Sequence, residues 1–203
     1  INKMLHGLRA SYVEAGQRQA LTLMTSLADW FGYGVLDKLT DEQVQQLLVC
    51  EHGSINESYL DVYELTGESR YLEWAGRLND RSMWVPLSEG RDILNGWHAN
   101  TQIPKFTGFE KFYVHTGDER FDRAARNFWE IVTTRHSWVI GGNSTGEHFF
   151  PESRFEEKVL KQGGPETCNS VNMMRLTEAL FAQRPDARMA EYYERVLLNH
   201  ILS

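Results

Sequence analysis

Tyr113-Val114-His115-Thr116-Gly117-Asp118-Glu119-Arg120-Phe121-Asp122 has the pattern of a junction between two helices. Tyr113 lies in the last turn of the first helix, and Gly117 supplies the left-handed cap that follows it. Asp118 then favours the N-terminus of a second helix. Beyond the junction, apolar residues recur at helical spacing, at Phe121, Ala124, Ala125, Phe128, Ile131 and Val132. The segment therefore predicts a helical hairpin.

The same junction is repeated along the chain. Copies begin at Tyr12, Tyr63 and Tyr113, at spacings of 51 and 50 residues, and a weaker copy begins at Phe181 after 68 residues. Four hairpins at this period favour an all-α fold, either an α-solenoid or an incomplete (α/α)6 toroid. Similar apolar periodicity follows the first and last copies, at Leu21, Leu23, Met24, Leu27, Ala28 and Phe31 and at Ala190, Tyr193, Val196 and Leu197. Residues 137–140, Ser-Trp-Val-Ile, give the best strand signal and predict a short ribbon.

The repeat length also bears on domain organisation. A closed ring of six such hairpins would need roughly 300 residues, whereas the chain has 203. We therefore expect residues 1–203 to form a single segment of a toroid domain, truncated at both ends. The open end of such a ring would expose apolar surface, which would favour self-association.

Composition argues against two classes of partner. The chain has 28 Asp and Glu against 21 Lys and Arg, for a net charge of -7. Nucleic acid and anionic membranes both require clustered positive charge, so neither is expected as a partner. No apolar run approaches the roughly 20 residues needed to cross a bilayer. Aromatic residues make up 12% of the chain, which suits sugar-stacking platforms but also ordinary cores.

Polar residues that suit carbohydrate chemistry gather in the connections between the predicted hairpins. Glu147 follows a glycine-rich turn and precedes Phe149 and Phe150; apolar surroundings raise the pKa of a carboxyl group, as a general acid requires. Alternatively, Glu147 caps a turn or pairs with an arginine. His98 and Gln102 lie in a segment whose side chains can hydrogen-bond sugar hydroxyls, although His98 could equally be a histidine at the entry of a helix.

Three further residues have two interpretations each. Asn56 could bind substrate, or it could cap the helix that follows. Glu166 and Cys168 offer the oxygen and sulfur ligands that suit zinc, but they could equally be a first-turn charge and a small buried residue. Cys50 follows the apolar run Leu47-Leu48-Val49, and we interpret it as a core residue. Two cysteines cannot form a disulfide framework, so they leave the cellular compartment undecided.

Several long motifs occur in an order that resembles a known family. They are Trp97 to Lys105 (WHANTQIPK), Gly141 to Ser144 with Gly146 to Phe149, Glu166 to Asn169 (ETCN), Tyr192 to Arg195 and Asn199 to Leu202. Together they resemble the β-L-arabinofuranosidase-like glycoside hydrolases of families 127 and 146. The resemblance covers essentially the whole chain and implies an α/α-toroid catalytic domain, usually followed by β-sandwich regions.

The resemblance also implies a site. Members of these families are retaining exo-glycosidases that release terminal L-arabinofuranose from plant glycans or glycoproteins, with a cysteine nucleophile at a zinc site and a glutamate as acid/base. By the matching motifs, Glu147 would be the acid/base, Glu166 and Cys168 would be zinc ligands, and His98 would contact the sugar. An adjacent Cys-Cys pair supplies the nucleophile and further zinc ligands in the family. We expect that pair downstream of Ser203, so zinc should be weak or absent in residues 1–203 alone.

Two departures leave other functions open. His52-Gly53-Ser54 stands where the family has Gly-Gly-Met, which bears on the exact sugar, and no cysteine pair occurs. A sugar epimerase or isomerase on a similar toroid would use histidines as acid and base without a metal. A non-catalytic carbohydrate-binding fragment would use the same loops only to hold a sugar. Release of free arabinose, a changed sugar isomer, or neither would tell the three functions apart.

Overall fold

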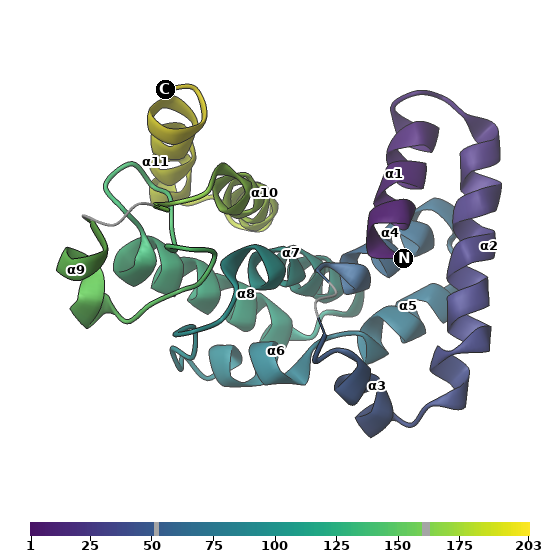
Figure 1. Cartoon of the computed structure of the whole chain (residues 1–203). Coiled ribbons are helices and arrows are strands. Elements are labelled where there is room, and N and C mark those ends of the chain that lie inside the picture. The colour runs from purple at the N-terminus through teal and green to yellow at the C-terminus, as the bar shows by residue number, and fades with distance from the viewer. Residues whose placement is uncertain (51–52, 160–162) are drawn as a thin grey trace.

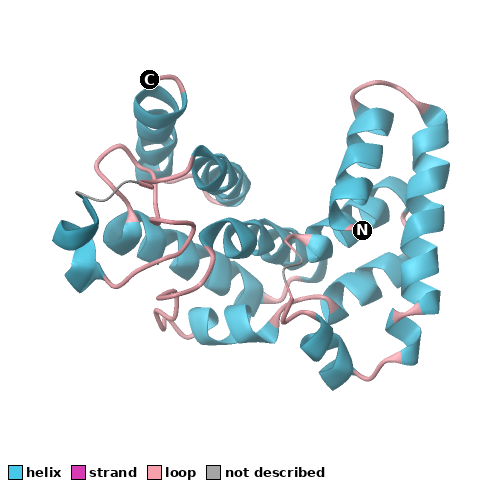
Figure 2. Ribbon diagram, viewed as in Figure 1, coloured by secondary structure: helices cyan, strands magenta, loops and turns pink. Residues whose placement is uncertain are grey.

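The computed structural model describes residues 1–50, 53–159 and 163–203, and its elements are helices, turns and loops (Figures 1 and 2). Within these ranges there are eleven α-helices and no strand. Eight of them form four hairpins, as the repeat predicts: α1 (Asn2–Val13) with α2 (Arg18–Gly34), α4 (Ile55–Thr66) with α5 (Ser69–Arg77), α7 (Ala99–Thr116) with α8 (Glu119–Ile131), and α10 (Thr167–Gln183) with α11 (Ala187–Val196). The prediction of an all-α fold of helical hairpins is therefore confirmed.

The hairpins follow one another along an open arc, with α1–α2 at one end and α10–α11 at the other (Figure 1). The first helices of successive hairpins contact each other, α4 against α7 and α7 against α10. Shorter elements fill the connections: α3 (Asp41–Leu47), α6 (Arg81–Ser88), α9 (Phe155–Val159) and 3₁₀ turns at Leu36–Lys38 and Glu152–Arg154. The six predicted site residues lie either in the long connections that precede α4, α7 and α10 or in the first turn of these helices.

Left-handed glycines end two of the inner helices where the repeated motif places them. Gly67 caps α4 with φ 74° and donates its N–H to the Tyr63 carbonyl, while Gly117 caps α7 with φ 72° and donates to the Tyr113 carbonyl. Asp118 then accepts a hydrogen bond from the Arg120 N–H at the start of α8. The motif thus turns the chain because each residue satisfies backbone groups that the helix ends leave open.

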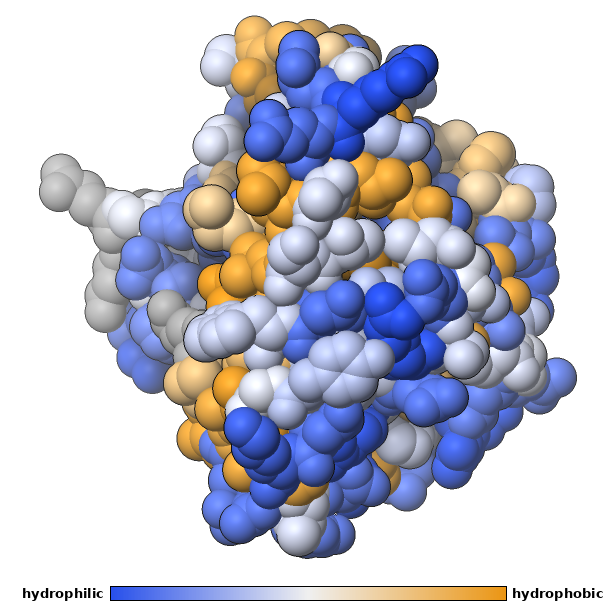
Figure 3. Space-filling view, turned by 90° about the vertical axis from the view of Figure 1, so that its right-hand side faces the viewer, coloured by the Kyte–Doolittle hydropathy of each residue, from blue (hydrophilic) through white to orange (hydrophobic). Residues whose placement is uncertain are grey.

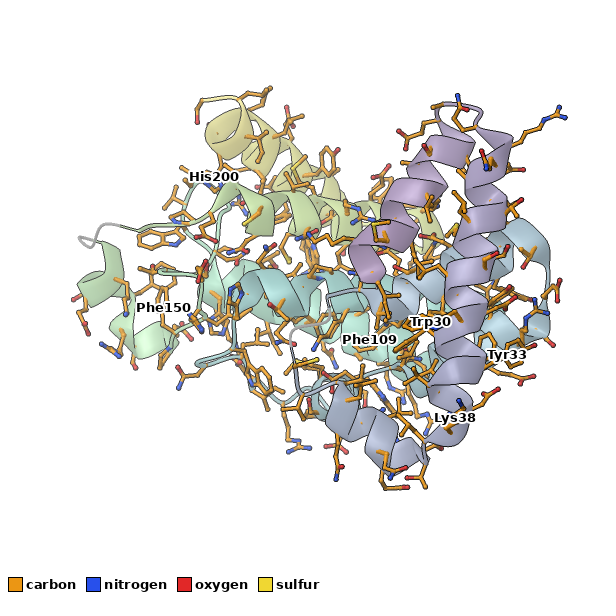
Figure 4. All side chains as sticks on the ribbon, turned by 45° about the vertical axis from the view of Figure 1, so that its right-hand side comes forward. Trp30, Tyr33, Lys38, Phe109, Phe150 and His200 are labelled. Atoms are coloured by element: carbon orange, nitrogen blue, oxygen red, sulfur yellow. The ribbon has the colours of Figure 1, made fainter. Side chains whose placement is uncertain are left out.

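The apolar faces of the hairpins meet in two clusters. One joins α6, α7, α8, α10 and α11, with the Phe106 and Phe128 rings stacked at 3.8 Å between centroids. The other joins α1 to α5, and the Phe112 side chain packs against both clusters. Each apolar position predicted between Phe121 and Val132 is buried. Figure 4 shows Phe109, another fully buried ring, deep among the helices.

Two sequence-based assignments of individual residues are wrong. Leu23 is 51% exposed, because it lies on the outward side of α2 beside the buried stripe. Cys50, interpreted as core, is exposed in the connection after α3, which ends at Leu47.

The predicted ribbon at residues 137–140 is also absent from the described structure. The chain leaves α8 through a π-helical turn (Val132–His136), and a tight turn follows in which the Gly141 N–H donates to the Trp138 carbonyl. This reversal leaves one isolated bridge between Ser137 and Asn143 instead of a strand. A second π-helical turn (Leu197–Ile201) ends α11 in the same way.

Exposed apolar side chains remain on the end of the arc that α2 forms. Trp30 and Tyr33 are 62% and 54% exposed, and Figure 4 shows both on this helix. The same side of the molecule carries hydrophobic patches in a largely hydrophilic surface (Figure 3). Self-association stays a prediction. None of the described helices is long and apolar enough to cross a membrane.

Candidate active site

A short antiparallel contact joins the loop that carries Glu147 to the turn that carries His98. The Gly96 N–H donates to the Phe149 carbonyl, and the Phe149 N–H donates to the Trp97 carbonyl, both at 2.9 Å. The Ala99 N–H donates to the Glu147 carbonyl at 2.8 Å, at the start of α7. These bonds fix the backbone of the glutamate against the first turn of an inner helix.

Glu147 itself adopts a left-handed backbone conformation, with φ 68°. Residues with a Cβ rarely occupy this region, and such strain is concentrated at functional sites. The conformation presents the side chain to solvent, and 57% of its surface is exposed. Phe149 and Phe150 turn into the core instead, at 2% and 5% exposure. The expectation that these rings surround the Glu147 carboxyl group is therefore wrong.

The carboxylate of Glu147 lies beside His98. Its Oε2 atom is 3.6 Å from Nε2 of His98, and the His98 ring in turn meets the His148 ring edge to face at 5.2 Å between centroids. Both Glu147 and His98 line a cleft of about 590 Å³. The structure therefore brings together two residues that the sequence separates by 49 positions.

Two residues of α10 on the wall of this cleft were missed by sequence reasoning. The Asn172 side-chain amide donates to Oδ1 of Asn100 at 2.9 Å, and Arg175 forms a 2.7 Å ion pair with Glu57, which is 3% exposed. Both line the cleft with His98 and Glu147. Asn172 and Arg175 are polar residues three positions apart in a largely apolar helix, a spacing that puts both on one face. This spacing was the signal available in the sequence.

The two predicted zinc ligands lie together at the start of α10. The Cys168 thiol is 3.5 Å from Oε2 of Glu166; Cys168 is exposed and Glu166 is half-buried at this end of the helix. Partial burial and the neighbouring Glu166 raise the pKa of the Cys168 thiol. Asn169 connects this turn to the Glu147 loop, because its amide donates to Oγ of Ser144 at 2.7 Å.

The chemistry of Glu166 and Cys168 suits zinc, although two ligands are fewer than a zinc site needs. An oxygen and a sulfur at one helix end are typical zinc donors, and zinc takes about four ligands in proteins. Within the described residues, however, no group of three or more His, Cys, Asp or Glu side chains could hold a metal ion. Any zinc at Glu166 and Cys168 would need ligands from elsewhere.

The two remaining predicted site residues are both buried. Gln102 is 4% exposed and lines a second cavity beside the cleft. Asn56 is 2% exposed, and its amide donates to Oδ1 of Asn79 and to the Lys105 carbonyl. Asn56 therefore joins α4 to α7 inside the helix packing, and this position does not support the role expected for it in binding substrate.

His200 holds the loops around α10 in place. Its Nδ1 is 2.8 Å from Oγ of Ser170, and its Nε2 is 3.1 Å from the Pro165 carbonyl (Figure 4). His136 plays the same part after α8, between the Phe150 carbonyl and Asp92. Glu51 and His52, which the sequence places in the loop before α4, lie outside the described residues.

An open arc of helical hairpins, with a carboxylate and a histidine meeting at its interhairpin loops, defines an α/α-toroid domain. The sequence matches the β-L-arabinofuranosidase GH127 catalytic domain over residues 1–203. The chain therefore belongs to the GH127 catalytic-domain family. None of the curated proteins matches it.

Solved structures agree with this fold. A GH127 β-arabinofuranosidase superposes with a TM-score of 0.75 at 21% identity, over 97% of this chain and 32% of its own. A GH127 β-L-arabinofuranosidase from Geobacillus stearothermophilus T6 gives 0.70 at 20% identity, over 97% and 35%. A further glycoside hydrolase gives 0.72 at 18% identity, over 98% and 37%. The chain thus spans about a third of each structure.

Proposed function

We propose that this chain carries the acid/base part of the active site of a retaining, exo-acting β-L-arabinofuranosidase. The observation that carries the proposal is the Glu147–His98 pair in a cleft of a GH127 domain, with 3.6 Å between the carboxylate and the imidazole. The substrates would be arabinose-containing plant glycans or glycoproteins, in keeping with the names of the similar structures.

Glu147 has the position that such a reaction requires. In a retaining mechanism, one carboxyl group protonates the leaving oxygen and later removes a proton from the attacking water. Glu147 is accessible from the cleft, and His98 is close enough to orient its carboxylate and to hydrogen-bond a sugar hydroxyl. Asn100, Asn172 and Arg175 add further hydrogen-bonding groups to the same wall. Attack on the anomeric carbon would fall to a residue outside this chain, as the family resemblance implies.

Glu166 and Cys168 would hold zinc together with ligands from outside residues 1–203. When bound, the metal keeps a coordinating thiol deprotonated. The link from Asn169 to Ser144 supports this assignment, because it ties the proposed zinc ligands to the loop that carries Glu147. Glu166 itself is not among the residues that line the cleft around Glu147 and His98.

Product analysis tests the proposal. The full-length protein should convert a β-L-arabinofuranosyl disaccharide into free L-arabinose, followed by ¹H NMR. A changed sugar isomer without hydrolysis would indicate an epimerase or isomerase instead. Binding of the disaccharide without any conversion would indicate a carbohydrate-binding module. Either result would overturn the proposed activity.

A further inference from the structure

A second cavity opens beside the proposed active-site cleft, between α3, the start of α6 and the first turns of α7. Its volume is about 550 Å³, within the range of small-molecule sites. Leu48, Cys50, His98 and Thr101 line both cavities, so the second one continues from the cleft on the far side of His98. None of the roles proposed above uses it.

One wall of this cavity contains buried polar groups whose hydrogen-bonding capacity is only partly used. Gln102 is 4% exposed, and its carbonyl oxygen has no hydrogen-bond partner among the described residues. A buried polar atom without a partner costs about 1–3 kcal/mol. One helical turn further along, Nζ of Lys105 lies 2.7 Å from Oδ2 of Asp80, and both side chains are almost fully buried. A lysine ammonium has three donors, of which Asp80 takes one.

Both the lysine and the arginine that line this cavity already face carboxylates. Nζ of Lys105 lies 2.7 Å from Asp80, and Arg81 lies 3.7 Å from Asp41 at the rim. An anionic ligand would therefore compete with carboxylates that already hold these cations. A neutral ligand rich in hydroxyl groups fits better, because hydroxyls both donate to and accept from such groups.

Apolar surface completes the site. Trp97 is half-buried and lines the cavity together with Leu48 and Val49. Sugar rings present hydroxyl groups at their edges and C–H groups on their faces, so a cavity with one polar wall and an aromatic side chain suits them. The turn that carries Trp97 is the one that positions His98 against Glu147.

We propose that this cavity is a second sugar subsite, which binds an uncharged sugar residue adjacent to the arabinofuranose held in the cleft. Gln102 and the Lys105–Asp80 pair would bind its hydroxyl groups, and Trp97 would contact its ring. This inference rests on the proposed glycosidase function. It predicts that the enzyme selects a neutral disaccharide over a simple alkyl arabinofuranoside.

A surface variant tests the subsite without disturbing the core. Val49 is 85% exposed and lines the cavity, so Val49→Trp should narrow it while the fold is retained. In the full-length protein, kcat/KM is measured for a β-L-arabinofuranosyl-pentose disaccharide and for methyl β-L-arabinofuranoside. We expect Val49→Trp to lower the ratio of the two values about tenfold, the loss of roughly one ligand contact. Val139→Trp, at an equally exposed valine that lines neither cavity, should leave the ratio unchanged.

Calorimetric binding separates failure of the subsite from failure of the proposed function. Disaccharide binding to Glu147→Gln protein should weaken when Val49→Trp is added, or when Gln102→Leu removes the amide but keeps the bulk. Unchanged binding and an unchanged ratio would overturn the subsite, whether or not the enzyme hydrolyses the sugar. Tighter binding of a disaccharide with a uronic acid in the second position would overturn the neutral class. Subsite-dependent binding without hydrolysis would overturn only the glycosidase.

Discussion

At the scale of single residues, the central feature is the backbone of Glu147, which is held in the left-handed region by the loop around it. Gly146 has φ 55° and Ser144 has φ 68°, so three of the four residues from Ser144 to Glu147 share the left-handed conformation. The bond from the Ala99 N–H to the Glu147 carbonyl fixes the loop to α7. Its rigidity explains how an exposed carboxylate can be held at a defined distance from His98.

Replacement of Glu147 should slow the proton-transfer steps of hydrolysis. In the full-length protein, Glu147→Gln retains shape but removes the titrating group, and we expect kcat for a disaccharide to fall by about 10²–10⁴. An aryl arabinofuranoside with a good leaving group needs less protonation, so its glycosylation step should suffer less. Steady-state and burst kinetics measure both. Glu152→Gln, at an exposed carboxylate in the following turn, is the control. If wild type and Glu147→Gln hydrolysed both substrates at equal rates, the acid/base role would belong to another residue.

Glu110 on α7 should make stability depend on pH. It is 1% exposed, neither carboxylate oxygen has a hydrogen-bond partner among the described residues, and burial raises its pKa from 4.5 to about 7. Between pH 4.5 and about 7, the folded state therefore holds a proton that the unfolded state has released. The contribution of Glu110 to the free energy of unfolding falls as the pH rises through this range.

Glu110→Gln should remove that dependence. The neutral amide avoids ionisation in the core, so the variant should gain about 3 kcal/mol over wild type at pH 8, with no such gain at pH 4. Urea unfolding at a series of pH values measures the difference. Glu119→Gln, at a side chain 79% exposed, is the control. A difference that does not change with pH would mean that Glu110 ionises normally in the folded state.

Sequence reasoning named some residues of the candidate site and missed others. His98 and Glu147 could be named because each stands in a long motif, and the structure brings them together. The spacing of Asn172 and Arg175 could place both on one helix face but not beside Glu147, since that depends on how α10 packs against α7. The apolar surroundings expected for Glu147 were wrong for a related reason. Residues close in sequence point in different directions, and Phe149 and Phe150 turn into the core.

At the scale of elements, helical periodicity predicted the hairpins well, because each junction encodes its own cap. Gly67 and Gly117 end their helices as the motif requires. The π-helical turns after α8 and α11 and the missing ribbon at residues 137–140 were beyond such reasoning. They depend on tertiary contacts, such as those of His136 with Phe150 and Asp92.

The cap at Gly117 can be tested against a glycine without this role. Gly117→Ala forces a Cβ into φ 72° with no neighbouring atom within 4 Å, so its effect reports the backbone alone. We expect a loss of about 1–2 kcal/mol in unfolding free energy. Gly7→Ala, inside α1 and also without neighbours, should be neutral or gain about 0.5–1 kcal/mol. Equal effects of the two substitutions in thermal unfolding would contradict the cap.

At the scale of the whole molecule, residues 1–203 bring two zinc-type ligands to one end of the arc. Metal affinity depends on a pre-assembled set of ligands, and the described residues offer only Glu166 and Cys168 together. Elemental analysis should therefore find substoichiometric zinc in residues 1–203 and stoichiometric zinc in the full-length protein. Cys168→Ser should deplete zinc in the full-length protein, whereas Cys50→Ser should not. Tightly held zinc in residues 1–203 alone would contradict this division of the ligands.

The most direct test of the account is chemical rescue of Glu147→Ala in the full-length protein. With an activated aryl β-L-arabinofuranoside, a retaining enzyme that lacks its acid/base residue should accumulate a glycosyl intermediate, because no group activates water. Azide needs no such activation, so adding it should accelerate turnover and yield β-L-arabinofuranosyl azide, identified by NMR. Turnover that does not respond to azide, with no glycosyl azide formed, would show that Glu147 is not the acid/base residue of a retaining glycosidase.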